Sequence, residues 1–160
     1  MQLPRYHEDM ALPKWLTPAE MKAWRGFISS STDLVRAIEK DLEPFGLDGG
    51  DYQLLAMLSD APGHRLKMCD LASVLRLSRS GLTRRMEGVV KAKYVARVRD
   101  ETDGRVAFAQ LTPKGFDLLK RAAPEHLKSV RRLMIDQLTE AEVKAIGSAF
   151  AKIGKTLRDE

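Results

Sequence analysis

The side chains best able to carry chemistry are cations gathered in one stretch of the chain. Between Arg76 and Arg99 the sequence holds eight Lys or Arg residues and a single acid, Glu87. The stretch therefore carries +7 in a chain whose net charge is +5, and the remainder sums to −2. An evenly basic surface would spread its charge along the chain, whereas a protein that neutralises nucleic-acid phosphates concentrates it. The pattern predicts a nucleic-acid partner.

The sequence contains few of the residues and motifs on which catalysis or metal binding usually depends. It contains three histidines and one cysteine, Cys69. It shows no phosphate-binding loop, no Cys/His spacing typical of a metal site and no nucleophile elbow. We therefore expect no enzyme activity, no cofactor and no metal, and a site built from carboxylates alone is the one enzymatic alternative left open. The single cysteine also rules out an intrachain disulfide framework.

The basic stretch has the pattern of two helices followed by two strands. Helices are predicted at about 67–75 and 79–92, separated by a turn at 76–77, with Ser78 as the cap of the second. Strands are predicted at 94–99 and 106–111, joined by a charged loop at 100–105. Helical periodicity puts an apolar set on one side of the second helix and a polar set on the other: Leu82, Met86, Val89 and Val90 against Ser80, Thr83, Arg84, Glu87 and Lys91. This order predicts a helix-turn-helix followed by a wing.

Strong helix signals flank this motif on both sides. Thr17 and Glu20 form a capping box that opens a helix at about 18–42, and a second helix is predicted at 52–59. Thr112 and Pro113 open a further helix, which Pro124 is expected to kink or split, with its apolar stripe continuing to about 137. A second capping box at Thr139 and Glu142 opens the last helix.

These end helices carry more apolar surface than one small core can cover. We therefore expect helices from both termini to pack together and against a second copy of the chain. The predicted fold is mainly α with a small β wing, a winged helix-turn-helix domain plus a helical dimerisation region from both termini. The predicted divisions are 1–46 (an arm at 1–14 with Pro4 and Pro13, then a dimerisation helix), 47–112 (DNA-binding domain) and 113–160 (dimerisation helices).

Length and composition suit one domain, or one domain plus a dimerisation extension. The chain has 160 residues, of which 44% are hydrophobic, enough for a real core. No apolar run approaches the roughly 18 residues that span a bilayer, and the first residues lack the apolar core of a signal peptide. We expect a cytoplasmic protein with no membrane partner.

Two motifs carry a resemblance to a known family. The first is LSRSGLTR at 77–84, preceded by Leu71-Ala72, and the second joins DETDGR at 100–105 to LTPKG at 111–115. With them, from about Thr17 to Leu157, the chain resembles the multiple-antibiotic-resistance regulator (MarR) family of bacterial transcription factors. The resemblance implies a homodimeric repressor that binds a pseudo-palindromic operator in double-stranded DNA with half-sites about 10 bp apart.

The resemblance also implies roles for particular residues. Residues 78, 79, 80, 83 and 84 would meet the major groove and nearby phosphates, and Asp103 would orient Arg105 in the minor groove. The full set of predicted DNA contacts is Ser78, Arg79, Ser80, Thr83, Arg84, Lys91, Arg99, Asp103 and Arg105. Members of the family commonly respond to small, often aromatic ligands in a crevice between the dimerisation helices and the DNA-binding lobe. The polar or aromatic residues expected near such a crevice are Trp15, Trp24, His64, Asp70, His126 and Arg131.

Two positions depart from the family pattern. Lys93 stands where the family usually has the glycine that ends the recognition helix, so this corner is expected to be built differently. Gly88 lies inside the helix, where it costs about 1 kcal/mol against alanine, and this suggests a close approach by another segment or a helix that firms up on DNA.

Two alternative functions stay open. Cys69 lies beside Met68 and Leu71, which favours a structural, packed thiol, while an oxidant-sensing thiol is the alternative. A non-specific DNA-binding protein would share the basic stretch, but it would show little sequence preference.

Overall fold

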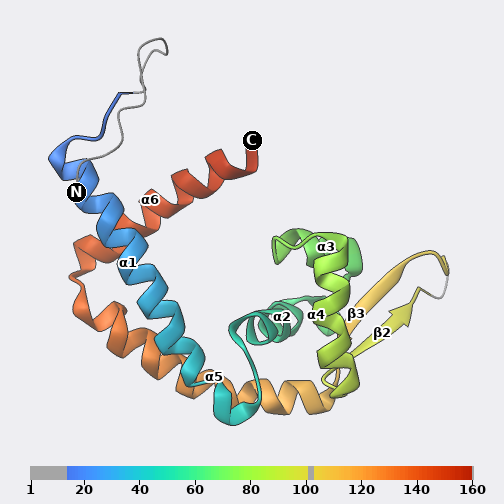
Figure 1. The fold of residues 1–160 in the computed structure, drawn as a ribbon. Coiled ribbons are helices and arrows are strands. Elements are labelled where there is room, and N and C mark those ends of the chain that lie inside the picture. The colour runs from blue at the N-terminus through green and yellow to red at the C-terminus, as the bar shows by residue number, and fades with distance from the viewer. Residues whose placement is uncertain (1–13, 101–102, 160) are drawn as a thin grey trace. The chain divides into compact units, whose positions relative to one another are not determined.

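The computed structural model describes residues 14–100 and 103–159 of the chain (Figure 1). The chain divides into two compact units, 1–33 and 34–160. Most of the predicted N-terminal arm, including Pro4 and Pro13, lies outside the described residues, as do Glu101 and Thr102 of the predicted wing loop.

Helices dominate the structure, as predicted. The first unit holds the greater part of α1, Pro18–Lys40, and the second holds its last residues and all the other elements. In chain order these are the short 3-10 helix η1 (Glu43–Phe45), α2 (Gly49–Asp60), η2 (Pro62–His64), β1 (Arg65–Lys67), α3 (Met68–Val74), α4 (Arg79–Lys91), β2 (Val95–Arg99), β3 (Ala107–Leu111), α5 (Pro113–Leu133), η3 (Ile135–Gln137) and α6 (Glu140–Asp159).

Side-chain caps begin most of these helices. In both predicted capping boxes the acid accepts from the backbone N–H of the cap residue: Glu20 accepts from Thr17 at 2.7 Å and Glu142 accepts from Thr139 at 2.8 Å. The helix α2 starts three residues before its predicted start because Asp48 caps it, accepting from the N–H of Asp51 at 2.7 Å. Local hydrogen bonds to the free N–H groups of the first turn thus determine where these helices begin.

The sheet has three strands rather than the two predicted. Its order is β1-β3-β2 with both pairs antiparallel, and β1 pairs Leu66 with Ala109 while β2 pairs Arg97 with the same residue. The strand β1 was not predicted, and Lys67 was assigned to the helix expected at about 67–75. The β2–β3 hairpin extends beyond the helices to form the wing (Figure 1).

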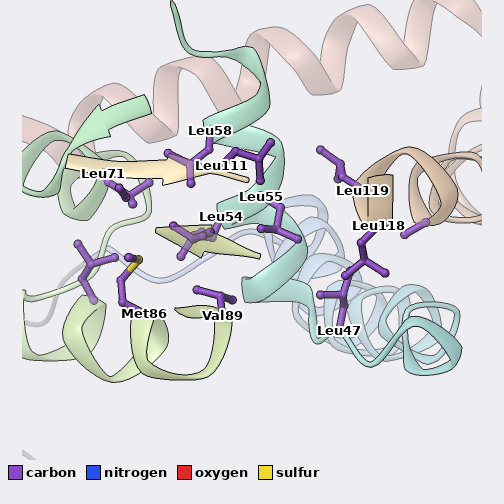
Figure 2. Close-up of a cluster of buried hydrophobic side chains, with 14 of the residues drawn as sticks. Leu47, Leu54, Leu55, Leu58, Leu71, Met86, Val89, Leu111, Leu118 and Leu119 are labelled. Atoms are coloured by element: carbon purple, nitrogen blue, oxygen red, sulfur yellow. The ribbon is translucent and has the colours of Figure 1, made fainter. Parts of the chain in front are cut away.

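One hydrophobic core lies between α2, the helix-turn-helix, the sheet and the first half of α5 (Figure 2). Three leucines of α2 are fully buried at its centre, as predicted from their spacing. Around them lie side chains from every neighbouring element, Leu71 of α3, Met86 and Val89 of α4, Leu111 of β3, and Leu118 and Leu119 of α5. One face of α4 is therefore buried in this core, and the opposite face is exposed.

The helix α5 runs unbroken through Pro124, so the proline does not split it. It ends at Leu133 and η3 follows, which places its end before the predicted 137. Within the described residues, no helix has both the length and the apolar character required to cross a bilayer.

The end of α4 is a Schellman motif built with lysine in place of glycine. Lys93 has a φ of 63°, its N–H donates to Val90 at 2.9 Å, and the N–H of Tyr94 donates to Val89 at 2.9 Å. The corner therefore has the usual geometry, and the expectation of a different one is wrong. A side chain in this left-handed conformation costs about 1 kcal/mol.

Gly88 faces open space. A Cβ added there would meet no atom within 4 Å outside the helix itself, so no described segment approaches it closely. The predicted close approach is wrong, and the alternative, a helix that firms up on DNA, remains a prediction.

Candidate nucleic-acid interface

The helix α4 has one buried and one exposed face, as its periodicity predicts. Leu82, Met86 and Val89 are buried in the core, and the exposed residues form an open groove along the helix. This groove is lined by Ser78, Arg79, Ser80, Thr83, Arg84 and Glu87, which include five of the nine predicted DNA contacts. The structure thus brings these five together on one surface.

The hydroxyls at the start of α4 are held in place by local hydrogen bonds. Ser78 caps the helix by accepting from the N–H of Gly81 at 3.0 Å, and its Oγ lies 3.1 Å from that of Ser80. Thr83 donates its hydroxyl to the carbonyl of Arg79 at 3.0 Å, which leaves its oxygen lone pairs facing outward as acceptors. The N-terminal turn of α4 therefore offers a fixed arrangement of polar groups beside exposed guanidinium groups.

A second groove, of about 490 Å³, lies between α3, the start of α4 and the start of β3. Its floor is mainly apolar, while Lys67, Arg79 and Arg105 supply cations and none of its lining residues is an acid. Thr83 and Arg79 line this groove too, so the helix and the wing share one positively charged surface. Lys67 was missed by sequence reasoning, and the alternation Arg65-Leu66-Lys67 of a short edge strand is the signal that would have found it.

Hydrogen bonds to the backbone hold the wing turn. The carboxylate of Asp103 accepts from the backbone N–H of Arg105 at 3.0 Å, and the N–H of Asp103 donates to Asp100 at 3.1 Å. Asp103 therefore fixes the backbone at Arg105. Its predicted effect on the guanidinium of Arg105 stays a prediction.

Lys91 and Arg99, the remaining two predicted contacts, are exposed at the C-terminal end of α4 and the end of β2. Neither lines either groove. Their contact with DNA remains a prediction, and it would lie outside the two grooves.

Among the described residues, one of the eight cations of the basic stretch is neutralised by acidic side chains. Arg85 binds the carboxylates of Asp48 and Asp51, the latter at 2.9 Å. The carboxylates hold the pKa of Arg85 above its usual value, mainly through their hydrogen bonds. The charge available to phosphates is therefore smaller than the sequence count suggests.

Cys69 is exposed, so the expectation of a packed structural thiol is wrong. Its Sγ donates to the carboxylate of Asp70 at 3.4 Å, and the residue lines the second groove with Lys67, Arg79 and Arg105. The thiol is therefore accessible in a groove that also contains three cationic side chains.

The residues expected near an effector crevice have separate sets of neighbours. Trp15 and Trp24 belong to the first unit, and Trp24 lies 6.3 Å from the ring of Phe27. The Nδ1 of His64 lies 2.8 Å from the carbonyl of Ser59, and its ring lies 5.4 Å from that of Phe116. Asp70 contacts Cys69, and Arg131 binds Asp136. None of the six lines either groove formed by the described residues.

His126 differs from the other five because its Nδ1 is buried and has no hydrogen-bond partner in the described part of the chain. Its ring lies 4.3 Å from that of Tyr52. Burial lowers the pKa of His126, although the charge of Asp41 acts in the opposite direction. The neutral imidazole is therefore favoured at neutral pH.

The sequence and the fold both match known proteins. The profile of the MarR family matches residues 45–106. AbsC, a MarR family transcriptional regulator from Streptomyces coelicolor, is 37% identical with a TM-score of 0.89, and the match covers 92% of this chain and 100% of AbsC. Sco3205, a MarR family regulator of the same organism solved in complex with DNA, is 33% identical with a TM-score of 0.87, covering 91% and 92% of the two chains.

A curated relative is similar over a shorter span. The transcriptional repressor YetL of Bacillus subtilis is 27% identical over 111 residues, which cover 68% of this chain and 66% of YetL. The relatives are named as transcriptional regulators, which agrees with the expectation that the chain is not an enzyme.

Proposed function

Because this chain belongs to the MarR family of DNA-binding transcriptional regulators, we propose that it is a homodimeric repressor of a pseudo-palindromic operator, released by a small aromatic ligand. In this proposal the residues 47–112 bind DNA, and the segments 1–46 and 113–160 form the dimer. The observation that carries it is the exposed polar face of α4, which continues through Arg79 and Thr83 into the cationic groove at the wing.

The proposed DNA contacts follow from this surface. The start of α4 enters the major groove, where Arg84 can bind guanine through two hydrogen bonds and the hydroxyls of Ser80 and Thr83 meet base edges or phosphates. Arg105 at the wing tip reaches the adjacent minor groove, whose narrow form attracts arginine. Arg79 lies between them and neutralises the intervening phosphates.

The proposed dimer is supported by the uncovered apolar stripe of α6. Within the described chain none of the residues of α6 is buried, and Ile153 and Leu157 are 51% and 67% exposed. Leu127 on α5 is also exposed. A second copy that covers these side chains would place two α4 helices about 10 bp apart on a duplex.

The regulatory part of the proposal has two supports. YetL, at 27% identity, is named a repressor, which favours repression over activation. The buried and unpartnered Nδ1 of His126 beside the Tyr52 ring is a candidate contact for an aromatic ligand that carries a hydrogen-bond donor. Screening small aromatic acids and phenols for release of bound DNA tests this part.

Replacing Arg84 by alanine should weaken binding to the preferred duplex by about 1–3 kcal/mol, with a smaller loss on a shuffled duplex of the same composition. The preferred duplex is the one that the wild-type protein selects from a random-sequence library. Titrations of both duplexes with a fluorescent label give the two affinities. Arg121→Ala, which removes an equal charge from an exposed site on α5, is the matched control.

Two results would count against this assignment. Equal binding of the selected duplex by the wild type and Arg84→Ala would remove Arg84 from the proposed base contacts, and equal binding by Arg105→Ala as well would discard the proposed DNA surface. A wild type that binds selected and shuffled duplexes equally would instead favour a non-specific DNA-binding protein.

A second candidate regulation, oxidant sensing, is favoured by the exposure of Cys69 in the cationic groove. Peroxide is expected to convert the thiol to a sulfenic acid at a surface that the proposal assigns to DNA, and so to weaken DNA binding. Cys69→Ser should bind the selected duplex as the wild type does and keep that affinity after peroxide treatment. Unchanged peroxide sensitivity in Cys69→Ser would discard oxidant sensing.

A further inference from the structure

Arg85 lies on the inner face of α4, next to the exposed Arg84. It lies three residues after Leu82 and four residues before Val89, so helical geometry places it at the edge of the buried face. The Arg85 side chain is 29% exposed and that of Asp51 is 24% exposed, so this ion pair is partly shielded from solvent, whereas the Asp48 side chain is 58% exposed. Two adjacent arginines of the same helix therefore point to different environments.

The start of α2 forms a cradle for the Arg85 guanidinium. Asp48 and Asp51 both bind its Nη1, and a Cβ added to Gly50, between them, would lie 2.5 Å from its Cζ. Glycine at position 50 is what leaves room for the guanidinium between the two carboxylates. Burial alone would raise the pKa of Asp48, but hydrogen bonds from Arg85 and from the backbone of Asp51 lower it, so Asp48 stays charged.

The same carboxylate of Asp48 caps α2 and binds Arg85. The contact thus joins the first turn of α2 to the middle of α4. Since α2 packs against α5 through the shared core, α4 is tied to the rest of the second unit by this polar contact as well as by apolar packing. Apolar packing has no preferred direction, whereas the hydrogen bonds of a planar guanidinium require a particular orientation of the two partners.

We propose that Arg85 is a positioning residue for sequence-specific DNA binding: held by Asp48 and Asp51 over Gly50, it sets the rotation of α4 that presents Ser80, Thr83 and Arg84 outward. Arg85 itself does not contact DNA. This inference rests on the proposed function, since it assumes that the outer face of α4 reads the duplex.

Removing the cradle gives the sharpest test, because the two roles for Arg85 predict opposite signs. The double variant Asp48→Ser/Asp51→Ala keeps an N-cap hydroxyl and a good helix former but removes both carboxylates. If Arg85 only positions α4, binding of the selected duplex should weaken about tenfold, the size of one lost base contact, while binding of the shuffled duplex should not weaken. If Arg85 were a DNA contact, freeing its charge would tighten binding to both duplexes.

A second variant keeps every charge in place. Gly50→Ala raises the helix propensity of α2 and pushes the Arg85 guanidinium from its position, so we expect a folded protein whose binding of the selected duplex is weaker, again about tenfold. Gly49→Ala is the matched control, because the nearest atoms to its Cβ belong to the exposed Glu39 side chain, which can move away. Circular dichroism and urea unfolding of each variant show that the fold is retained.

The salt dependence of Arg85→Ala separates positioning from phosphate contact. The slope of log affinity against log salt should match that of the wild type, because no phosphate contact is lost, whereas a contact with one phosphate would lower it by about one charge. A lower slope, or a cradle variant that binds the selected duplex as tightly as the wild type, would overturn the inference. Loss of binding in Arg84→Ala with normal binding in the cradle variant would leave the proposed function standing and remove only the role of Arg85.

Discussion

Replacing Gly115 by alanine is expected to destabilise the protein by about 3 kcal/mol, although the same change usually stabilises a helix by about 1 kcal/mol. A Cβ at this position would overlap the carbonyl oxygen of Tyr94 and lie 2.9 Å from the Cδ1 of Leu111. The carbonyl cannot move aside easily, since it accepts from both the N–H and the hydroxyl of Thr112 at 3.0 Å. The strain therefore falls on the backbone that joins the end of α4 to the start of α5.

Urea unfolding at fixed protein concentration measures this effect as a lower midpoint with an unchanged slope. Gly88→Ala is the control, because it makes the same substitution inside a helix where the added Cβ meets no neighbour. It should stabilise by about 0.5–1 kcal/mol. A Gly115→Ala protein as stable as the wild type would show that the junction between β2, β3 and α5 is not closely packed.

Introducing a charge on the apolar stripe of α6 should have the largest effect on function. In Ile153→Asp the carboxylate would be buried in the proposed dimer without a partner, at a cost of about 3–5 kcal/mol for each copy. The chain should then become monomeric at micromolar concentration. Binding of the selected duplex should fall by more than about a hundredfold, because two half-sites are no longer engaged together.

Sedimentation or light scattering gives the mass, and titration of the selected duplex gives the affinity. Ser148→Asp adds the same charge at an exposed position on α6 away from the stripe, and it should remain a dimer. A dimeric Ile153→Asp protein would show that α6 does not form the interface. A wild type that is monomeric at the same concentration would reject the homodimer itself.

The sequence predicted the helices well because their signals are local. Thr17, Ser78, Thr112 and Thr139 each supply a hydroxyl to a first turn, and the structure confirms each as a cap. The periodicity of α4 also separated its buried from its exposed face correctly. Such signals act over three or four residues, so one sequence is enough to detect them.

Features that depend on distant partners were harder to predict. The strand β1 is only three residues long and exists because it pairs with β3, more than forty residues later in the sequence. Arg85 was counted with the free cations because its partners Asp48 and Asp51 lie 34 residues or more before it. Pairing of this kind depends on the tertiary fold and leaves little trace in local patterns.

The candidate site shows the same division. The cluster at the start of α4 follows from one helix, and the structure brings Ser78, Thr83 and Arg84 together as predicted. The second groove is formed by residues of several elements that are distant in the sequence. Lys67 and Cys69, which line it, were therefore not assigned to it. The six residues expected near an effector crevice have separate sets of neighbours, so their grouping remains a prediction.

Because Cys69 is exposed, a thiol-reactive dye can label the protein selectively at this residue. It is the only thiol in the sequence and it opens into the groove between α3, α4 and the wing. An alkylating dye will therefore attach at one place in each subunit without any engineering. The rate at which the dye reacts reports whether that groove is open or covered, so titrating duplex against alkylation rate gives a footprint of occupancy on the protein side.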